Sequence, residues 1–459
     1  MTDRHDAHGY ITDVAYPAHF HREIMPVWLV CTLQALGRHM PDLRQPFTWL
    51  ELGCGMGLST LVAAACHPQG RFIGVDFSAR EIDTARQLAQ QAGLHNVEFV
   101  CESLSETAAH ALGTGTPDCD FIVTHGVYSW ISEADRQAID RCIEQRLRPG
   151  GIAYVAYMSH PGSASFAAAQ KLMRMASQHL PGDSASRARS SMNLLQHLAR
   201  NGAGYFIEHP AIQREMERAD QMDDAYMAHE FLNAEWHSLH VSDVMARFAA
   251  AGCEYAGSAT LLDNIDAISI PAQMQPVLAQ MQRQGADAAA LETTRDIARN
   301  QNQRRDLYQK TAPHGNRLGP DAHRCALLAQ QVMRLPAASA ADALSAPSEL
   351  VLQTRIGPVA VPMPQLTPLL QALRQGPCHY ADLARLPAYA RNPGFISQLL
   401  QVLVWNGWLH FMPPPFPVAS ASAQTLQAVL AQAGFGQWQL LPEAGTAIEK
   451  MKKMPGQNT

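Results

Sequence analysis

Charged residues are scarce in this chain, and neither sign dominates. They make up 17% of the 459 residues, and the formal net charge is −6 at pH 7. A protein that binds nucleic acid without sequence preference needs a broad positive surface to hold the phosphate backbone. We therefore expect no nucleic acid partner.

Long apolar runs are also missing. No uninterrupted stretch approaches the ~20 apolar residues that cross a bilayer, because Pro, Gly or charged residues break the longest candidates. The segment Met1–His21 contains Asp3, Asp6 and Asp13 and lacks the basic start and apolar core of a secretory signal. We expect a soluble protein with no membrane partner, whose 47% hydrophobic residues are enough to form buried cores.

Closely spaced cysteine pairs are absent. The nine cysteines are odd in number and show no C-x-x-C spacing, which suits the reducing cytoplasm rather than a disulfide framework. The histidine spacings His19-x-His21 and His237-x-x-His240 have no nearby Cys and no third and fourth ligand at zinc spacing. The sequence therefore predicts a cytoplasmic protein without a metal site.

A chain of this length exceeds one ordinary core, so we expect two or three domains. Between Phe47 and Met158 short apolar, β-rich runs alternate with helical patterns, which is typical of βαβ units and a parallel sheet. The predicted fold class is therefore α/β. The expected strands are Phe47–Leu52, Arg71–Asp76, Val97–Glu102, Asp120–His125 and Gly151–Tyr157, with helices such as Ala79–Ala92 and Ser132–Leu147 between them.

Beyond His160 the pattern changes to long helical stretches up to about Val244, which we interpret as a lid beside or over the sheet. Cys253–Asp263 reads as a possible strand near the end of that domain. Further helices are expected over Ala272–Met281 and Ala288–Tyr308.

The C-terminal part is predicted to be a separate unit. Ala337–Ser348, rich in Ala, Ser and Pro, is interpreted as a linker. After it, three expected helices and a short strand from Gly407 or Trp408 resemble a winged helix; the helices are Leu366–Arg374, Tyr380–Leu386 and Phe395–Asn406. Phe395–His410 contains no Lys, Arg, Asp or Glu, so a packing or protein-contact role is favoured over DNA binding.

A glycine-rich turn follows the first expected strand, in the run W-L-E-L-G-C-G-M-G-L-S-T from Trp49 to Thr60. A ligand approaches the backbone closely where Cβ is absent, and glycine adopts positive φ without strain. Asp76 ends the next strand, nineteen residues after Gly57, where a carboxylate can accept hydrogen bonds from both ribose hydroxyls. Ordinary βα turns also use glycine. The spacing G-x-G-x-G after an acidic residue, however, differs from the G-x-G-x-x-G that wraps a pyrophosphate.

Together, E-L-G-C-G-M-G and G-V-D-F-S resemble the first two cofactor motifs of class I S-adenosylmethionine-dependent methyltransferases. The resemblance implies a doubly wound, mostly parallel sheet of seven strands, with S-adenosylmethionine as cofactor and S-adenosylhomocysteine as product. The methionine portion would be held by Glu51 and the turn of Gly53, Cys54, Gly55 and Gly57, the ribose by Asp76, and the adenine by Phe77. In the third motif the acidic position is taken by Glu102 or, one residue later, by Ser103.

A second resemblance is narrower. Tyr16–Glu23, His125–Trp130 and Ala228–Asn233 are similar to segments of bacterial methyltransferases that carry a methyltransferase regulatory domain. Some members of that family methylate protein lysines. Where relatives tend to show Y-N-T-Y-P-G-W after the fifth strand, this chain has Y-M-S-H-P-G-S at Tyr157–Ser163, and that loop borders the acceptor site in this fold class.

The segment after the fourth strand should face the transferred methyl group, because ligands of open α/β sheets lie at the carboxyl ends of the strands. Three residues there are candidates for catalysis. His125, also expected at the cofactor, is a candidate general base, and Tyr128 and Trp130 would turn aromatic faces toward the sulfonium or a cationic acceptor. Each has a structural alternative, since strand-end histidines are often only hydrogen-bonded and aromatic residues often only pack.

The residues before the first strand are expected to fold over the cofactor, as N-terminal segments of this fold class often do, or else to form a surface helix. Tyr16 is predicted to contact the cofactor, with Tyr10, His19 and His21 beside it.

The predicted domains are residues 1–45 over the cofactor site, 46–160 as the cofactor-binding core, 161–270 as the lid and end of the catalytic domain, 271–336 as a helical connector, 337–348 as the linker and 349–459 as the winged-helix-like domain.

These observations favour an enzyme that transfers methyl from S-adenosylmethionine to an N or O acceptor, with a protein lysine as one candidate. A small-molecule methyltransferase is the first alternative, and the altered loop Tyr157–Ser163 favours it. A non-catalytic, cofactor-binding regulator is the second. The methyl acceptor and the oligomeric state are left open, because no motif determines the shape of the lid.

Overall fold

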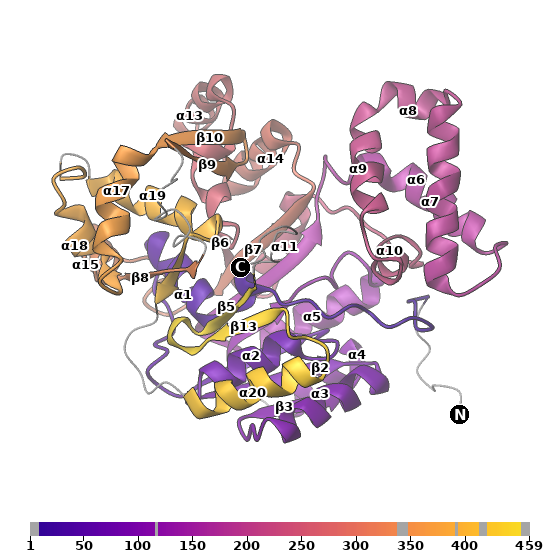
Figure 1. Ribbon diagram of the computed structural model, residues 1–459, viewed down its shortest axis with the longest axis horizontal. Helices are drawn as coiled ribbons and strands as arrows, with labels where there is room; N and C mark the ends of the chain where they lie inside the picture. The colour runs from indigo at the N-terminus through magenta and orange to yellow at the C-terminus, as the bar shows by residue number, and fades with distance from the viewer. Residues whose placement is uncertain (1–8, 115–117, 337–347, 391–392, 413–419, 451–459) are drawn as a thin grey trace, which may run out of the picture.

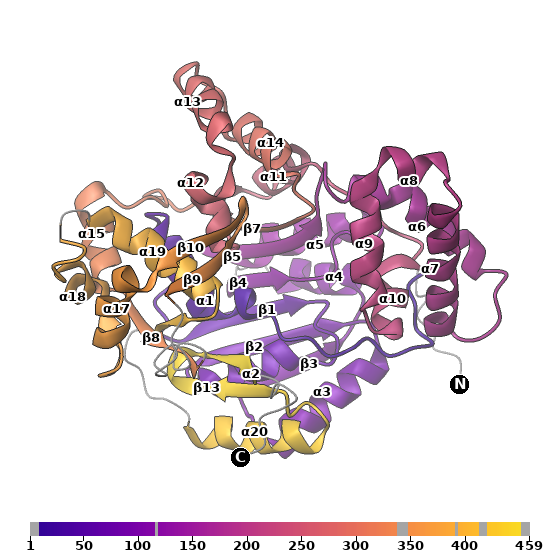
Figure 2. The ribbon, with the colours of Figure 1, turned by 45° about the horizontal axis from the view of Figure 1, so that its top comes forward.

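The structure is a computed structural model, and it describes residues 9–114, 118–336, 348–390, 393–412 and 420–450. Its centre is a seven-stranded sheet in the order β3-β2-β1-β4-β5-β7-β6 (Figures 1 and 2). Strands β1 to β5 pair in parallel, and β7 runs antiparallel to both β5 and β6. The predicted doubly wound, mostly parallel α/β sheet is confirmed. Its strands are β1 (Phe47–Leu52), β2 (Gly70–Asp76), β3 (Val97–Cys101), β4 (Cys119–Thr124), β5 (Leu147–Met158), β6 (Cys253–Ser258) and β7 (Gln303–Lys310).

Helices close both faces of this sheet, because successive residues of a buried strand point to opposite sides. On β1, Trp49 packs in the apolar cluster that contains α1, α2 and α3, whereas Leu50 packs with α5 and α11 on the other face. The carboxyl ends of the parallel strands are left for a ligand. These helices are α1 (Pro26–Ala35), α2 (Leu58–Cys66), α3 (Ala79–Gln91), α4 (Leu104–Thr114), α5 (Glu133–Arg146) and α11 (Val241–Ala250).

Strand β7 corrects the helix predicted over Ala288–Tyr308. Helix α14 covers only Ala288–Arg299 and ends where Asn300 adopts a left-handed φ of 50°. The chain then enters the sheet between β5 and β6, so the sheet extends beyond residue 270, the predicted end of the catalytic domain. The intervening elements are η3 (Leu261–Asn264), α12 (Asp266–Ser269), η4 (Ala272–Met274) and α13 (Gln275–Arg283).

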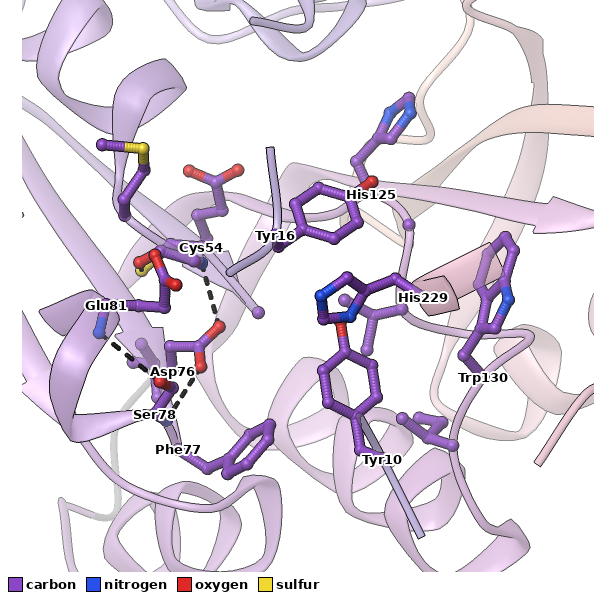
Figure 3. A pocket seen from close by; sticks show the side chains of 18 of the residues that line it. Tyr10, Tyr16, Cys54, Asp76, Phe77, Ser78, Glu81, His125, Trp130 and His229 are labelled. Atoms are coloured by element: carbon purple, nitrogen blue, oxygen red, sulfur yellow. Dashed lines mark hydrogen bonds between the residues drawn. The ribbon is translucent and has the colours of Figure 1, made fainter. Parts of the chain in front are cut away.

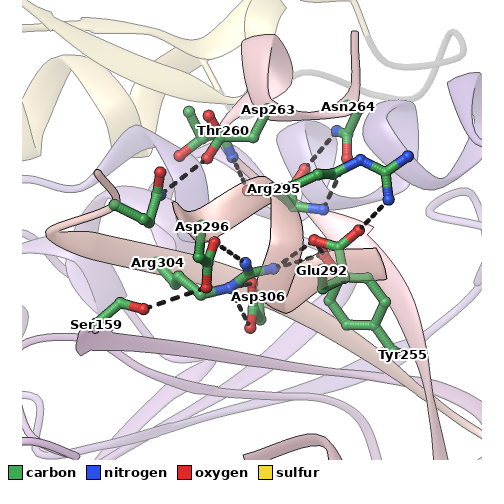
Figure 4. A network of polar contacts seen from close by, with 12 residues as sticks. Ser159, Tyr255, Thr260, Asp263, Asn264, Glu292, Arg295, Asp296, Arg304 and Asp306 are labelled. Atoms are coloured by element: carbon green, nitrogen blue, oxygen red, sulfur yellow. Dashed lines mark hydrogen bonds and ion pairs between the residues drawn. The ribbon is translucent and has the colours of Figure 1, made fainter. Parts of the chain in front are cut away.

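The pattern of β7 is misleading because two of its charged residues, Arg304 and Asp306, are buried. Arg304, with 2% of its side chain exposed, donates to Asp306 at 2.9 Å, to Asp296 at 2.5 Å and to Glu292 at 2.9 Å (Figure 4). Burial raises the pKa of Asp306 to about 6, and the charge of Arg304 opposes this shift. Removing an ion from water costs several kcal/mol, so each buried charge here depends on its partners.

A group of helices at the carboxyl end of the sheet, residues 164–231, forms the lid (Figure 2). It has its own apolar cluster, which includes Phe166, Met192 and Met227. Neither here nor elsewhere in the described residues is a helix both long and apolar enough to cross a membrane. The lid consists of η2 (Ala164–Phe166), α6 (Ala167–Ser177), α7 (Ser184–Arg200), α8 (Gly204–Glu208), α9 (Pro210–Asp220) and α10 (Asp224–Phe231).

The C-terminal residues form two pieces that share a small apolar cluster of Leu335, Leu441 and Ala444, and the single predicted unit stays a prediction. The first is a three-stranded antiparallel sheet, β11-β8-β12, packed with helices. Its strand β8 precedes the predicted linker, whose residues 337–347 lie outside the described ones, and the winged helix stays a prediction. The first piece comprises α15 (Pro320–Ala329), β8 (Gln331–Arg334), β9 (Glu349–Thr354), β10 (Gly357–Pro362), α17 (Met363–Ala372), β11 (Cys378–His379), α18 (Tyr380–Ala384), α19 (Pro393–Trp405) and β12 (Leu409–Met412).

The second piece packs against the central domain. Helix α20 lies along α2 and α3, and β14 contacts α2, the helix that follows the glycine turn (Figure 1). Its elements are α20 (Ser420–Gln432), β13 (Trp438–Leu441), η6 (Pro442–Ala444) and β14 (Thr446–Glu449). The described residues of this second piece therefore pack on the helix that begins at the predicted cofactor site.

We expect Arg304→Met to lower the free energy of unfolding by ~3–5 kcal/mol, because Asp306 would stay buried without its cation and Asp296 would keep only Arg299, at 3.4 Å. The control is Arg385→Met, since the Arg385 side chain is 79% exposed and pairs with Asp382 within one helical turn. Exposed pairs of this kind contribute ~0–1 kcal/mol. Denaturant unfolding measures both losses, and equal losses would show that the buried network does not stabilise the sheet.

Candidate cofactor and methyl-acceptor site

A cavity of about 690 Å³ lies at the carboxyl ends of β1 to β4 (Figure 3). Of the predicted catalytic residues, His125 and Trp130 line it, and Tyr128 does not. The cavity is thus the place where the two cofactor motifs and the segment after β4 meet. The predicted cofactor residues that line it are Tyr16, Glu51, Gly53, Cys54, Gly55, Asp76, Phe77, Glu102, Ser103 and His125.

The glycine turn brings the backbone to the wall of the cavity. Gly53 has a φ of 76° and Gly55 a φ of 53°, in the left-handed region that strains other residues. A Cβ at Gly53 would lie 2.3 Å from Val127 Cγ2, whereas a Cβ at Gly55 would meet no atom within 4 Å. Gly55 therefore keeps room for a ligand. Gly57 is the N-cap of α2 and lies outside the cavity lining, so its contact with the cofactor stays a prediction.

Asp76, the last residue of β2, is held by backbone donors on both sides. The Gly55 N–H donates to Oδ2 at 2.9 Å, and the Ser78 N–H donates to Oδ1 at 2.9 Å (Figure 3). Burial raises the pKa of the Asp76 carboxyl, and these hydrogen bonds oppose the shift. Each carboxylate oxygen can accept a second hydrogen bond. The carboxylate is therefore placed and oriented as two ribose hydroxyls would require.

Glu51 is a second carboxyl group beside the turn. It is 4% exposed, and the Thr60 hydroxyl donates to its Oε2 at 2.5 Å. Burial raises the pKa of Glu51 to about 8. A cation next to such a group stabilises its ionised form. The ammonium group of a methionine moiety would supply that cation, which agrees in charge with the predicted contact.

The predicted adenine end of the cavity is lined by Phe77, Glu102 and Ser103. The ring of Phe77 lies edge-on to Tyr10, with 5.7 Å between the centroids, so two aromatic rings border this end. The Glu102 carboxylate is 3.0 Å from His110 Nδ1. Both residues of the unusual third motif thus reach the cavity, and the contact of either with adenine stays a prediction.

Residues 10–22, here called the strap, cross the cavity between the sheet and the lid. Tyr10, Tyr16, His19 and His21 of the strap line the cavity. Figure 3 shows Tyr16 between Cys54 of the glycine turn and His229 of α10, with Tyr10 next to His229. The structure therefore places the N-terminal aromatic residues where the sequence predicts them, over the cofactor motifs.

The strap is fixed to the lid by backbone and side-chain contacts. The Ile11 N–H donates to Asn233 Oδ1 at 3.0 Å, and His229 Nε2 donates to the Val14 carbonyl at 3.1 Å. The His229 ring also lies edge-on to Tyr16, with 5.1 Å between the centroids. Helix α10 thereby becomes part of the wall of the site.

His125 follows β4 and faces the strap. Its Nδ1 lies 2.7 Å from the Tyr154 hydroxyl, and its ring stacks on His21 with 3.6 Å between the centroids. Burial lowers the pKa of His125 well below its ordinary range and that of His21 to about 4. Both imidazoles are therefore neutral at neutral pH. Because one ring nitrogen of His125 is already bound to Tyr154, its function as a general base stays a prediction.

Trp130 marks the end of the cavity away from the glycine turn (Figure 3). Its indole N–H donates to a carbonyl in the last turn of α10 at 3.2 Å. Asp135, in the first turn of α5, and Glu235, after α10, line the cavity as well. The His237 N–H donates to the Ser129 carbonyl at 2.9 Å, which brings the Glu235 segment next to the Trp130 loop. This end is aromatic and acidic, as a cationic group requires.

Tyr128 is the one predicted catalytic residue that the structure contradicts. It is fully buried on the face of the sheet that packs on α5 and α11, and its ring lies near Phe248. Its hydroxyl donates to Asp140 at 3.0 Å and accepts from Arg247 Nε at 3.0 Å. Tyr128 is therefore part of the core, which was its structural alternative.

Several lining residues have no predicted role. His229 lies within Ala228–Asn233, the segment that carries the second family resemblance, so the sequence did contain a signal for it. Asp135, Glu235 and Glu81 also line the cavity, but they belong to no motif. These three carboxylates come from α5, from the chain after α10 and from α3, so only folding brings them to the cofactor motifs.

Two family profiles match the chain. Residues 50–151 match the methyltransferase domain, and residues 223–310 match the predicted methyltransferase regulatory domain. The second match begins at α10, whose His229 lines the cavity, and ends with β7 in the sheet. The regulatory domain is thus built into the catalytic sheet and into the wall of the site.

Relatives agree with these matches. The protein sll1526 from Synechocystis is 33% identical over 300 residues, which are 65% of this chain and 58% of that protein, so the chain spans less than two thirds of its length. RP028 from Rickettsia prowazekii is 25% identical over 222 residues, 48% of this chain and 86% of that one. In fold, the chain is similar to PKMT2 from Rickettsia typhi at 20% identity with a TM-score of 0.63, covering 86% of this chain and 77% of PKMT2. The PKMT2 complex with AdoHcy gives 0.65 at 19% identity, with the same coverage.

We expect Asp76→Ala to weaken binding of S-adenosylmethionine by roughly 10- to 100-fold, because hydrogen bonds to a charged acceptor contribute ~1.5–3 kcal/mol. Asp83→Ala is the matched control, since the Asp83 side chain is 67% exposed on α3 and does not line the cavity. Titration calorimetry measures both affinities. Unchanged affinity in a folded Asp76→Ala variant would remove this carboxylate from the ribose site.

Trp130 and Tyr128 should respond in opposite ways to substitution. Trp130→Leu removes an aromatic face worth ~0.5–2 kcal/mol toward a cation, so methyl transfer should fall by about 2- to 30-fold while cofactor affinity is kept. Tyr128→Phe should keep full transfer and lose ~0.5–2 kcal/mol of stability, because Asp140 and Arg247 lose a partner. The assay follows labelled methyl from S-adenosylmethionine into a protein extract. A larger loss of transfer in Tyr128→Phe would return Tyr128 to the site.

The glycine turn with its open Gly55, the hydrogen-bonded Asp76 carboxylate, the strand order and the two family matches all agree. The chain therefore has the seven-stranded sheet of the class I methyltransferase fold, in which residues 50–151 match a methyltransferase domain and residues 223–310 a predicted methyltransferase regulatory domain.

Proposed function

We propose that the chain transfers the methyl group of S-adenosylmethionine to the side-chain nitrogen of a protein lysine. The observation that carries this proposal is the charge of the cavity. Among the described residues, the lining contains one guanidinium, Arg80, against the carboxyl groups of Asp76, Glu81, Glu102, Asp135 and Glu235; Glu51, whose pKa burial raises to about 8, adds no full charge near neutral pH. A field of this sign attracts a cationic acceptor and repels an anionic one.

The end of the cavity near Trp130 has a shape that also suits a lysine. Asp135 and Glu235 line the cavity together with Trp130, and Glu235 is 34% exposed at its side chain, so this end is open to a long acceptor. A lysine has an aliphatic stem that packs on aromatic rings and a cationic head that pairs with carboxylates. The pair of Asp135 and Glu235 would therefore hold the head of the lysine, and Trp130 its stem.

The chemistry needs few groups from the protein. The lysine nitrogen loses a proton to a base or to solvent, and its lone pair attacks the methyl carbon. The bond from that carbon to sulfur breaks, and sulfur keeps the electron pair, which gives neutral S-adenosylhomocysteine. In-line placement of nitrogen, carbon and sulfur contributes most to such a transfer. The strap and the lid supply that placement by enclosing the cavity from two sides.

The relatives support the same acceptor class. The family that the chain resembles includes protein lysine methyltransferases, and the similar solved fold is that of PKMT2, a protein lysine methyltransferase. The small-molecule alternative depends on the altered loop Tyr157–Ser163. None of the residues of this loop, all of which the structure describes, lines the cavity. The loop instead contacts the chain after α10, because the Ser163 hydroxyl lies 2.9 Å from that of Ser238.

The test incubates the purified chain with methyl-labelled S-adenosylmethionine and a protein extract, then separates protein from small molecules. We expect label in protein, and a mass increase of one methyl group on lysine in tryptic peptides. Label confined to the small-molecule fraction would contradict the proposal and favour the alternative.

The double variant Asp135→Asn/Glu235→Gln tests the acceptor end. Its KM for the acceptor should rise by roughly tenfold, corresponding to ~1.4 kcal/mol, with cofactor affinity kept. Glu217→Gln is the control, because Glu217 is an exposed carboxylate of the lid that does not line the cavity. Equal acceptor KM values in the three proteins would remove Asp135 and Glu235 from acceptor binding.

A further inference from the structure

The strap ends in three consecutive residues that contact two different parts of the molecule in alternation. Phe20 and Arg22 contact the C-terminal residues, whereas His21, between them, points to the cavity and stacks on His125. This alternation follows from the extended backbone at His21, with φ of −114° and ψ of 101°, which sends successive side chains to opposite sides.

Arg22 binds the end of a C-terminal helix. Its guanidinium donates to the Trp405 carbonyl at 2.6 Å and to the Val404 carbonyl at 3.4 Å. These carbonyls end α19, where helical carbonyls lack intrahelical partners and the helix dipole favours a cation. The guanidinium also lies 4.8 Å from the ring centroid of Trp28 and 5.3 Å from that of Trp405. Arg22 thus donates hydrogen bonds to the end of α19 and also contacts the rings of Trp28 and Trp405.

Phe20 binds the last piece of the chain. It is 8% exposed, and its ring centroid is 5.5 Å from that of Trp438 on β13. The same piece places α20 on α2. Between these two contacts, the His21 N–H donates at 3.3 Å to the Ser59 hydroxyl in the first turn of α2. The end of the strap is therefore held by the C-terminal residues and aligned on the helix of the glycine turn.

We propose that the described residues of 393–450, here called the C-terminal anchor, hold the strap closed over the cofactor site, with Arg22 and Phe20 as positioning residues. The anchor touches the strap on either side of His21, so His21 meets His125 only while both contacts are made. Release of the cofactor product requires the strap to move, and the anchor sets how often it does. This gives the C-terminal residues a function in cofactor exchange that does not depend on the identity of the methyl acceptor.

The test measures dissociation of S-adenosylhomocysteine from the full chain, with excess S-adenosylmethionine to prevent rebinding. Arg22→Met and Trp438→Leu each remove one contact of the anchor, and we expect release at least tenfold faster in both. Arg22→Lys should recover part of the loss, because an ammonium group can still donate to a carbonyl of α19. The control is Arg44→Met, whose guanidinium is 60% exposed and pairs with Asp42 outside the strap. Release within twofold of the unaltered chain in both folded variants would overturn the proposal.

Hydrogen exchange in the unaltered chain keeps the proposal testable if a variant fails to fold. Coupling between two sites is reciprocal, so binding of S-adenosylhomocysteine should slow exchange in the anchor as well as in the strap. We expect added protection in residues 10–24 and, with it, in residues 402–412 and 436–441. Protection of the strap alone would show that the anchor packs beside the strap without holding it, and the proposal would be wrong.

Discussion

The site is organised around one carboxylate that is held by backbone hydrogen bonds. Asp76 ends β2 partly buried at the wall of the cavity, and a charged group in such a place is stabilised by donors on it. The Gly55 and Ser78 amides supply them, and the first fixes the course of the glycine turn. Because the turn is pulled toward β2, Gly55 faces open space rather than side chains. The shape of the cofactor cavity is therefore a consequence of satisfying Asp76.

Most of the sheet could be predicted from the sequence, since β1 to β5 contain short, mostly apolar runs that alternate with helical patterns. Strand β7 could not, because Q-R-R-D-L-Y-Q-K has the composition of a surface segment. Burial of Arg304 and Asp306 depends on Asp296 and Glu292, which come from α14, and no local pattern shows that these ions will meet. A strand whose polar residues are paired across elements is recognisable only in three dimensions.

The candidate site divides in the same way. Its cofactor half is contiguous in sequence, because the strand, turn and following acidic residue form one local motif. Its proposed acceptor half is assembled from α5, α10 and the chain after α10, so Asp135, His229 and Glu235 become neighbours of the cofactor motifs only through folding. Tyr128 and Trp130 are two residues apart, yet one is in the core and one in the cavity. Spacing after a strand end does not determine the side to which an irregular loop turns each side chain.

The charge of the cavity and the contacts that hold the strap over it both bear on the release of the product. The described lining of the cavity holds six carboxyl groups, and a bound cation would favour the ionised form of Glu51, whose pKa burial raises to about 8. S-adenosylmethionine brings a sulfonium charge into this field, and transfer of the methyl group removes it, leaving a neutral thioether. Electrostatic attraction to the sulfonium centre therefore ends with the reaction, while the contacts of the strap do not change with the charge of sulfur. Product release then depends on how firmly Arg22 and Phe20 hold the strap, which is the step that the C-terminal anchor is placed to control.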